Sequence, residues 1–296
     1  MRLGYFIKMA RPANIITAIS DILAGCAIAG IFQNFTSVET KVAPLILLVI
    51  STIGLYGGGI VFNDIFDYKT DKINRPERVL PSGKISISEA TAFGIALFVI
   101  GIISAFYVSL LSGFFAISIC FLALSYDKYA KHNAVLGPIN MGLCRSMNLI
   151  LGISIINNVV NNMWFLGFIP LAFIAAITLV GQKEAHGNNK SSIVKAILLD
   201  TVVTLFFVYL MLSGYLKIWV TIPFLLFWFG VNLFAKTTAF FKNNPKKIQQ
   251  AVKIGILSLI PLNAIYVAGF ANWYYALLLI CLLPISMLIA KYYAVT

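Results

Sequence analysis

The chain has 296 residues, of which 60% are hydrophobic and only 11% are charged, and this composition excludes an ordinary soluble domain. Its formal net charge at pH 7 is +12, but the basic residues gather in alternate connections between apolar segments, which argues against nucleic-acid binding. The four cysteines lie inside apolar segments and form no CxxC pair, so neither a structural zinc site nor a disulfide framework is expected.

Ten apolar segments follow one another along the chain, and most reach the length of about 18 residues that a transmembrane helix requires. Such segments must be helical, because the lipid core offers no hydrogen-bond partner to backbone N–H and C=O groups. They comprise residues 13–32, 43–63, 88–110, 112–126, 134–157, 163–181, 192–213, 218–240, 249–270 and 273–291. We therefore predict an all-α integral membrane protein, a helical bundle of about nine to ten transmembrane helices, that forms a single domain over residues 1–296.

The basic residues indicate how this bundle is oriented. Lys and Arg are frequent before the first segment and after the second, fourth, sixth and eighth, whereas the other connections carry almost none. This is the positive-inside pattern, which predicts a cytoplasmic N-terminus and, with an even number of segments, a cytoplasmic C-terminus. We expect a multi-pass protein of the cell (inner) membrane whose polar loops face the cytoplasm and whose first segment is a retained helix, not a signal peptide.

The second segment ends in NDIFDYKTD, residues 63–71, which holds three of the ten acidic residues of the chain. Asn63, Asp67 and Asp71 follow one another at intervals of four, and Asp64 lies three before Asp67, so all four side chains are expected on one face of a helix. Mg²⁺ is commonly held by carboxylates together with substrate phosphates. We predict that Asp64, Asp67 and Asp71 bind Mg²⁺ and that Asn63 contacts a diphosphate. The alternative is a solvated helix end with ordinary surface acids.

The polar loop after this motif reads KINRPERVLPSGKIS and contains several basic residues. Basic side chains beside a metal site suit phosphate oxygens. We predict that Arg75 contacts the diphosphate. Arg78 and Lys84 either contact a phosphate or contribute only to the excess of positive charge in cytoplasmic loops.

A second basic stretch, YDKYAKHN at residues 126–133, follows the fourth segment. Tyr126, Lys128 and Lys131 are predicted to hold the diphosphate. Asp127, in the same stretch, is either a salt-bridge partner or a metal ligand.

The stretch GQKEAHGNNK at residues 181–190 follows the sixth segment. Glu184 is the only acidic residue between Asp127 and Asp200, and Asn188 follows it by four, so both side chains can share one helical face. We predict that Glu184 and Asn188 bind a second Mg²⁺, and we interpret His186 as a polar loop residue.

Charged residues also occur inside the apolar segments, where a charge at the bilayer centre costs about 2.5–3.5 kcal/mol on insertion scales. The clearest are Asp21, Arg145 and Asp200. Asn14 and Asp21 share a face of the first segment, and Arg145 and Asn148 share a face of the fifth. We predict that these four residues line a cavity or contact the acceptor. Arg145 either pairs with Asp21 or Asp200 or contacts the diphosphate or the acceptor, and a structural role is favoured for Asp200.

These motifs together resemble those of a known family. The pattern N-D-x-x-D-x-x-x-D at residues 63–71, followed by Arg75 and Pro76, resembles the first aspartate motif of the UbiA superfamily of intramembrane prenyltransferases. Three further stretches agree in order and spacing: RPANIITA at 11–18, Tyr126 and Lys131 with Gly137 after them, and KEAHGNNK at 183–190. The E-x-H-G pattern within the last stretch resembles a branch called EboC-like.

The resemblance implies a helical bundle around a central cavity that is accessible from the lipid. It also implies Mg²⁺-dependent transfer of an isoprenoid group from a polyprenyl diphosphate to an aromatic, quinone-precursor or other lipophilic acceptor. Carried over residue by residue, Asp64, Asp67 and Glu184 are the expected catalytic residues. The expected partners are the isoprenyl diphosphate donor, the hydrophobic acceptor and the lipid bilayer, with no nucleic acid.

The sequence departs from the family pattern in its second motif. Gly181 stands where that motif usually has its first aspartate, and Asn188 supplies no charge. A non-catalytic membrane protein that binds or transports a phosphorylated isoprenoid lipid is therefore the alternative function. The family usually has nine spans, so either the segment 273–291 is an addition or one of the ten lies at the membrane interface.

Overall fold

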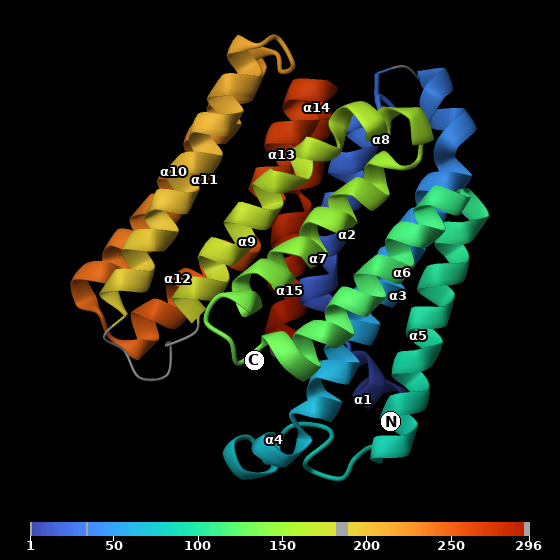
Figure 1. Cartoon of the computed structure of the whole chain (residues 1–296), viewed down its shortest axis with the longest axis vertical. Helices are drawn as coiled ribbons and strands as arrows, with labels where there is room; N and C mark the ends of the chain where they lie inside the picture. Colours follow the sequence, from blue (N-terminus) through green and yellow to red (C-terminus); the bar gives the residue numbers. More distant parts are fainter. Residues whose placement is uncertain (1, 34, 182–188, 293–296) are drawn as a thin grey trace.

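A computed structural model of the protein describes residues 2–33, 35–181 and 189–292, and helices are the only regular secondary structure within them (Figure 1). The α-helices in chain order are α1 (Arg2–Met9), α2 (Pro12–Ile28), α3 (Phe35–Phe66), α4 (Tyr68–Asn74), α5 (Ile87–Val108), α6 (Leu110–Ser125), α7 (Leu136–Ile153), α8 (Asn157–Met163), α9 (Phe168–Gly181), α10 (Lys190–Leu212), α11 (Ile218–Lys242), α12 (Pro245–Leu257), α13 (Leu259–Phe270), α14 (Trp273–Ile280) and α15 (Leu282–Tyr292). A π-helical turn, η1 (Tyr126–Ala130), follows α6, and a 3₁₀ turn, η2 (Trp164–Gly167), joins α8 to α9. The predicted all-α class is confirmed.

The ten predicted segments correspond each to one of these helices or to two consecutive ones. Eight helical stretches in the described part of the chain are long and apolar enough to cross a membrane: 41–66, 87–108, 110–130, 157–181, 190–212, 218–242, 245–270 and 273–291. The shorter apolar helix α2 and the more polar α7, which carries Arg145, account for the other two segments. The protein is therefore a multi-pass membrane protein, and its last segment forms α14 and α15.

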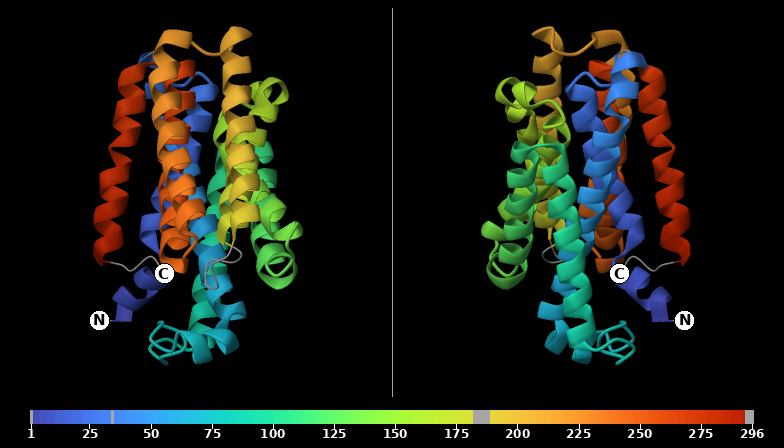
Figure 2. Two further views of the ribbon diagram at one scale, coloured as in Figure 1. Left: turned by 90° about the vertical axis from the view of Figure 1, so that its left-hand side faces the viewer. Right: turned by 90° about the vertical axis from the view of Figure 1, so that its right-hand side faces the viewer.

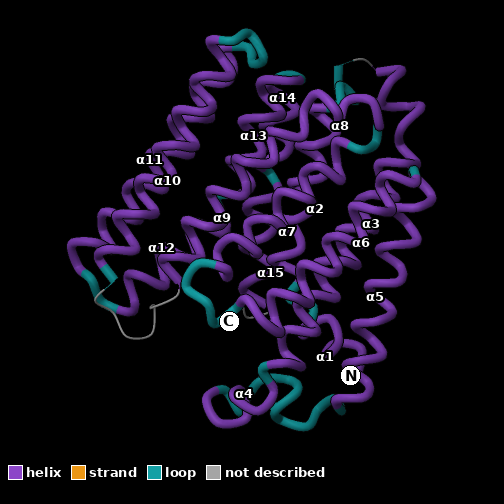
Figure 3. The backbone as a smooth tube through the Cα atoms, in the orientation of Figure 1, coloured by secondary structure: helices purple, strands orange, loops and turns teal. Residues whose placement is uncertain are grey.

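One end of the bundle carries the polar elements. Helices α1 and α4 lie at this end, which we name the α4 end, and the last helix α15 finishes on the same side (Figures 1 and 2). The longest connection shown in Figure 3 also lies there, between α4 and α5. A small apolar cluster, to which Met9, Val61 and Leu80 belong, packs α1 against α3 and this connection. The motif at residues 63–71 therefore lies at the end of the bundle where α1 and the connection between α4 and α5 pack against α3.

Helices α2 and α7 are central, because both contribute to the two largest apolar clusters. They approach each other closely at Gly25 and Gly152. A Cβ atom added at Gly25 would lie 2.4 Å from the carbonyl oxygen of Leu149, and one added at Gly152 would lie 2.6 Å from that of Ile22. Small residues let helix backbones meet in this way, and the close approach brings the polar residues of α2 and α7 within hydrogen-bonding distance.

Candidate functional site

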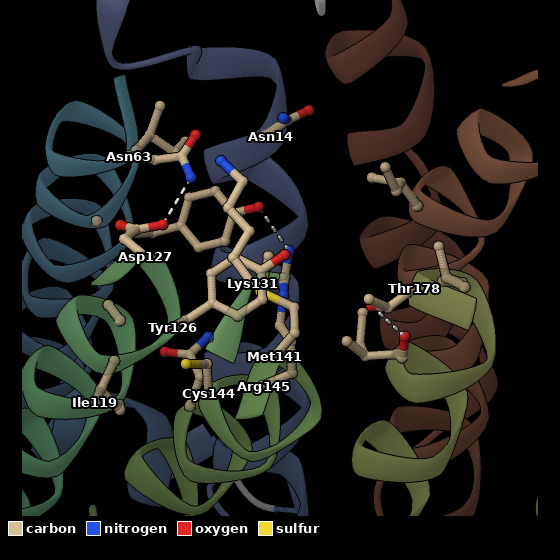
Figure 4. A pocket seen from close by; sticks show the side chains of 18 of the residues that line it. Asn14, Asn63, Ile119, Tyr126, Asp127, Lys131, Met141, Cys144, Arg145 and Thr178 are labelled. Carbon is tan, nitrogen blue, oxygen red and sulfur yellow. Dashed lines mark hydrogen bonds between the residues drawn. The ribbon is translucent and has the colours of Figure 1, made fainter. Parts of the chain in front are cut away.

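A cavity of about 590 Å³ lies between α2, α3, α6, α7, α9, α12 and α13 (Figure 4). Aliphatic side chains, among them Ile119, Ile177 and Leu259, form much of its wall. Its polar lining residues are Arg11, Asn14, Thr52, Tyr56, Asn63, Tyr126, Asp127, Lys131, His132, Arg145, Asn148 and Thr178. A largely apolar cavity with a few polar groups suits a lipophilic ligand that carries one polar head.

The motif at residues 63–71 sits where α3 ends and α4 begins. The amide of Asp67 donates to the carbonyl of Asn63 at 2.9 Å, and the amide of Asp71 donates to that of Asp67 at 2.8 Å, so the helical register continues across the break. Asp64 and Asp71 share one partner, the guanidinium of Arg78, at 3.6 and 2.6 Å. Asp67 instead faces the ammonium group of Lys131. The three carboxylates therefore do not share one set of partners: Asp64 and Asp71 contact Arg78, whereas Asp67, at the break between α3 and α4, contacts Lys131.

Arg11 supplies a further cation to this motif, because its guanidinium lies 2.5 Å from Asp64. Arg11 is the N-cap of α2 and has a left-handed backbone with φ 48°, a region that residues other than glycine seldom adopt. Sequence reasoning named Arg11 only as part of a motif and left Arg78 undecided. The density of basic residues just after the acidic stretch could have identified Arg78, whereas nothing in the sequence pairs Arg11 with Asp64, 53 positions away.

The π-helical turn η1 presents the second basic stretch to the cavity. The amide of Lys131 donates to the carbonyl of Tyr126, five residues earlier, at 2.9 Å. Because this bonding closes a turn over five residues, Tyr126 and Lys131 come to the same side of the helix, and both line the cavity. Asp127 accepts a hydrogen bond of 2.6 Å from the side-chain amide of Asn63, so it is not the partner of Lys131 (Figure 4).

Two residues predicted to bind the diphosphate do not line the cavity. Lys128 is exposed, and its ammonium group lies over the ring of Tyr129, 5.1 Å from the ring centre. Arg75 is exposed at the C-terminal end of α4. A contact of these two side chains with the diphosphate therefore stays a prediction that their positions do not support: the π-helical turn directs Lys128 away from the side that carries Lys131, and Arg75 lies just past the end of α4.

A buried polar network connects α2 and α7 beside the cavity. Arg145 donates to Asp21 at 2.8 Å and to Thr17 at 2.6 Å. The side-chain amide of Asn148 donates to the same oxygen of Asp21 at 3.0 Å. Arg145 therefore pairs with Asp21 and not with Asp200, and because it also lines the cavity, its contact with the diphosphate or the acceptor stays a prediction.

Other side chains complete this network. The side-chain amide of Asn263 on α13 donates to Asp21 at 2.7 Å, and Tyr56 on α3 accepts from Arg145 at 3.3 Å. Arg145, Asn148, Asn14 and Tyr56 line the cavity, whereas Asp21 lies behind them. Sequence reasoning missed Asn263, because a single asparagine in an apolar segment carries no spacing signal.

Asp200 has a different partner, Lys236. Their charged groups lie 2.5 Å apart between α10 and α11, and both side chains are only 2% exposed. Neither residue lines the cavity. The position agrees with a structural role for Asp200, whose partner lay unrecognised within the predicted segment 218–240.

Only the two ends of the second motif are described. Gly181 ends α9 and lines the cavity. Asn189 is buried, and its side-chain amide donates to the carbonyl of Val180 at 2.8 Å. The predicted ligands Glu184 and Asn188, and the loop residue His186, lie outside the described residues.

The donor set at residues 63–71 fits Mg²⁺ with a phosphate ligand better than it fits Mg²⁺ alone. Within the described residues, no three Asp, Glu, His or Cys side chains lie close enough together to hold a metal ion. Carboxylate oxygens are nevertheless the ligands that Mg²⁺ prefers. The buried Nε atom of Arg78 has no hydrogen-bond partner among the described residues. Such an orphaned cationic donor beside acidic groups suits an anion that arrives together with a divalent cation.

Comparison with known proteins was made against families, curated relatives and solved structures. A model of the UbiA prenyltransferase family matches residues 23–257. The digeranylgeranylglyceryl phosphate synthase of Methanothermobacter thermautotrophicus is 29% identical over 179 residues, and the match spans 60% of each chain. The synthase of the same name from Methanosphaera stadtmanae is 26% identical over 272 residues, covering 85% of this chain and 95% of that protein. A UbiA homolog from Archaeoglobus fulgidus, solved with GPP and Mg²⁺, has the same fold, with a TM-score of 0.67 at 12% identity over 94% of this chain and 99% of that one.

Proposed function

Because this chain belongs to the UbiA prenyltransferase family, we propose that it transfers an isoprenoid group from a prenyl diphosphate to a lipophilic acceptor inside the membrane, with Mg²⁺ as cofactor. The relatives named digeranylgeranylglyceryl phosphate synthase support a prenyl transfer. The fold shared with a homolog that binds GPP and Mg²⁺ supports the choice of donor and metal. The proposed acceptors include a glyceryl phosphate that already carries one isoprenoid group, besides aromatic acids and quinone precursors.

One observation carries this proposal: three carboxylates and three cations meet at the polar end of a largely apolar cavity. Asp64, Asp67 and Asp71 are each held by Arg11, Arg78 or Lys131, and two of these cations line the cavity. A diphosphate needs cations around its oxygens, and an isoprenoid chain needs an apolar volume. The site offers both within one space, as a prenyl diphosphate requires.

The residues of this chain can promote loss of the diphosphate in several ways. When bound at the carboxylates, Mg²⁺ supplies positive charge that stabilises the leaving diphosphate. Arg11, Arg78 and Lys131 can then turn from the carboxylates to the diphosphate oxygens, where negative charge develops as the allylic C–O bond breaks. The aliphatic wall of the cavity keeps water from the resulting carbocation-like centre. The guanidinium of Arg145 already lies over the ring of Tyr56, 4.8 Å from the ring centre.

We further propose that the α4 end faces the cytoplasm of a cell (inner) membrane. The basic residues of the connections, such as Lys69, Lys72 and Lys84, lie in the part of the chain that forms this end. Cytoplasmic loops of membrane proteins carry such an excess of Lys and Arg. A soluble prenyl diphosphate could then reach Lys131 from the cytoplasm while a lipid acceptor enters from the bilayer.

The test is diphosphate release by the purified protein in nanodiscs. Geranyl, farnesyl and geranylgeranyl diphosphates are supplied with a pool of acceptors, with and without Mg²⁺, to wild type, Asp64→Ala, Glu184→Ala and the control Glu77→Ala. Glu77 is an exposed acid in the loop after α4. Release that needs Mg²⁺ and is lost in the first two variants but not in the control supports the proposal. Mg²⁺-dependent binding without turnover favours the non-catalytic alternative, and absence of both binding and turnover overturns the diphosphate site.

A further inference from the structure

We propose that Asp127 is a further catalytic residue, which receives a hydrogen bond from a hydroxyl group of the acceptor and accepts its proton during transfer. The inference rests on the proposed prenyl transfer and names the class of acceptor: a lipophilic molecule whose reacting atom is a hydroxyl oxygen. Three observations support the inference: Asp127 lines the cavity, it forms no ion pair among the described residues, and it lies deeper in the bundle than the predicted diphosphate site.

Asp127 is the only acidic side chain among the described residues that line the cavity. The carboxylates of Asp64, Asp67 and Asp71 lie outside this lining. Asp127 is 8% exposed, so it is nearly buried yet still reaches the cavity surface. A ligand inside the cavity would therefore meet Asp127 and not the carboxylates assigned to the metal.

Asp127 differs from those carboxylates in its partners too. Each of the other three forms an ion pair with Arg11, Arg78 or Lys131. Within the described part of the chain, Asp127 has no Lys or Arg nitrogen within ion-pair distance, and one oxygen accepts a hydrogen bond from Asn63 at 2.6 Å. Asn63 thereby fixes the orientation of the carboxylate and leaves its second oxygen for a ligand.

The level of Asp127 follows from two contacts between neighbouring segments. Asn63 at the end of α3 contacts Asp127 on η1. Four residues later along each segment, Asp67 contacts Lys131, which directly follows η1. Both segments therefore run in the same direction, and the Asn63–Asp127 contact lies one turn further inside than the Asp67–Lys131 pair. If Lys131 holds the diphosphate, the carbon that is attacked lies on the inner side of it, at the level of Asp127.

An ionised carboxylate only accepts hydrogen bonds, so its partner in the cavity must be a donor. A hydroxyl group at this place has its lone pairs free for the allylic carbon. In the transfer, the bond between that carbon and the diphosphate oxygen breaks, and its electron pair leaves with the diphosphate. The hydroxyl oxygen forms the new C–O bond with a lone pair, and its proton passes to Asp127. An ether and a free diphosphate result, and no oxidant or further reactant is needed.

The experiment compares wild type with Asp127→Asn in nanodiscs, with Glu77→Gln as an exposed acid-to-amide control. Binding of geranylgeranyl thiolodiphosphate, an unreactive donor analogue, is measured by calorimetry with and without Mg²⁺. Single-turnover transfer from geranylgeranyl diphosphate is then followed to three acceptors: a glyceryl phosphate with one geranylgeranyl group, its analogue with a thiol in place of the free hydroxyl, and 1,3-dimethoxybenzene, which offers only ring carbon.

We expect Asp127→Asn to keep Mg²⁺-dependent donor binding within about threefold of wild type and to lose about 100-fold or more of its transfer rate to the hydroxyl acceptor, the usual contribution of a positioned base. The thiol acceptor should restore most of the rate, because a thiol loses its proton far more readily than an alcohol. A purely structural role would not distinguish oxygen from sulfur.

Four results overturn the inference. The first is a wild-type transfer rate to the hydroxyl acceptor in Asp127→Asn, and the second is loss of donor binding in that variant, which would assign Asp127 to the metal site. The third is transfer by wild type to dimethoxybenzene but not to the hydroxyl, and the fourth is Mg²⁺-dependent donor binding by wild type with transfer to none of the three. In all four the proposed diphosphate site stands. The fourth also favours the non-catalytic alternative to the proposed function, and absence of Mg²⁺-dependent donor binding in wild type removes the diphosphate site itself.

Discussion

Arg145 on α7 donates a hydrogen bond of 2.8 Å to Asp21 on α2, in the middle of the bundle and beside the cavity. The two residues are 124 positions apart in the chain, and both are buried. Their meeting depends on the close approach of α2 and α7 at Gly25 and Gly152. Asp21 neutralises the guanidinium, so the part of the cavity wall around Arg145 offers hydrogen bonds without a net charge.

Removing one partner of this pair should be far more harmful than removing both. We expect Arg145→Met to lower the free energy of unfolding by about 3–5 kcal/mol, because Asp21 is left buried without a counter-charge. The double variant Asp21→Asn/Arg145→Met should recover a large part of that loss. Denaturant unfolding in detergent measures both values, and a double variant no more stable than Arg145→Met would contradict this expectation.

The helix crossing itself can be tested at Gly152. A Cβ atom at this position would approach the carbonyl oxygen of Ile22 to 2.6 Å, so Gly152→Ala must push α7 away from α2. We expect a loss of about 1–3 kcal/mol in unfolding free energy, the usual cost of overpacking. Gly230→Ala on α11 is the matched control, because nothing lies within 4 Å of its added Cβ. The interpretation fails if the two substitutions have the same effect in thermal unfolding.

Two lysines on the same helical turn should respond differently to substitution. Lys131 lines the cavity and pairs with Asp67, whereas Lys128 is exposed over Tyr129. Lys131→Met should weaken Mg²⁺-dependent binding of geranylgeranyl thiolodiphosphate by about 10–100-fold, which corresponds to the 1.5–3 kcal/mol of a charged hydrogen bond. Lys128→Met should leave that affinity within about twofold. Calorimetry in nanodiscs gives both affinities, and a larger effect at Lys128 would contradict the structure.

Mg²⁺ and the diphosphate should each bind weakly alone and tightly together. The motif carboxylates already have cationic partners, such as Arg11 on Asp64. Mg²⁺ must displace these side chains from the carboxylates, and the displaced side chains can then bind the diphosphate. We expect each ligand to raise the affinity for the other by about 5–150-fold, the usual range of coupling between sites. Titration of Mg²⁺ with and without the donor analogue, after removal of metal with EDTA, provides the measurement. Equal Mg²⁺ affinities in the two titrations would show that the ion pairs do not exchange.

The second buried pair should matter for stability alone. Asp200 and Lys236 are both 2% exposed and lie away from the cavity lining. Lys236→Met should cost about 3–5 kcal/mol of unfolding free energy, because Asp200 stays buried without a partner. The transfer rate per folded molecule should not change. A selective loss of rate in molecules that remain folded would mean that this pair communicates with the site.

The sequence by itself determined the fold class, the approximate limits of the ten segments and the position of the acidic motif. Each of these depends on local order in the chain: the length of an apolar run decides whether it can cross a bilayer, and a spacing of four residues decides which side chains share a helical face. The role of Lys131 in holding the diphosphate stays a prediction from the basic stretch and the family resemblance, and its place beside Tyr126 depends on the π-helical turn. The ligands Glu184 and Asn188 remain predictions from spacing, because they lie outside the described residues.

Only the tertiary structure decided which charges meet. Arg11 reaches Asp64 across 53 positions, and Lys131 reaches Asp67 across 64. No local pattern encodes such contacts, because they depend on which helices are neighbours and how close they come. The same reason explains why Asp127 was left without a definite role: the inner faces of α3 and η1 become one wall of a cavity only when the helices are packed together.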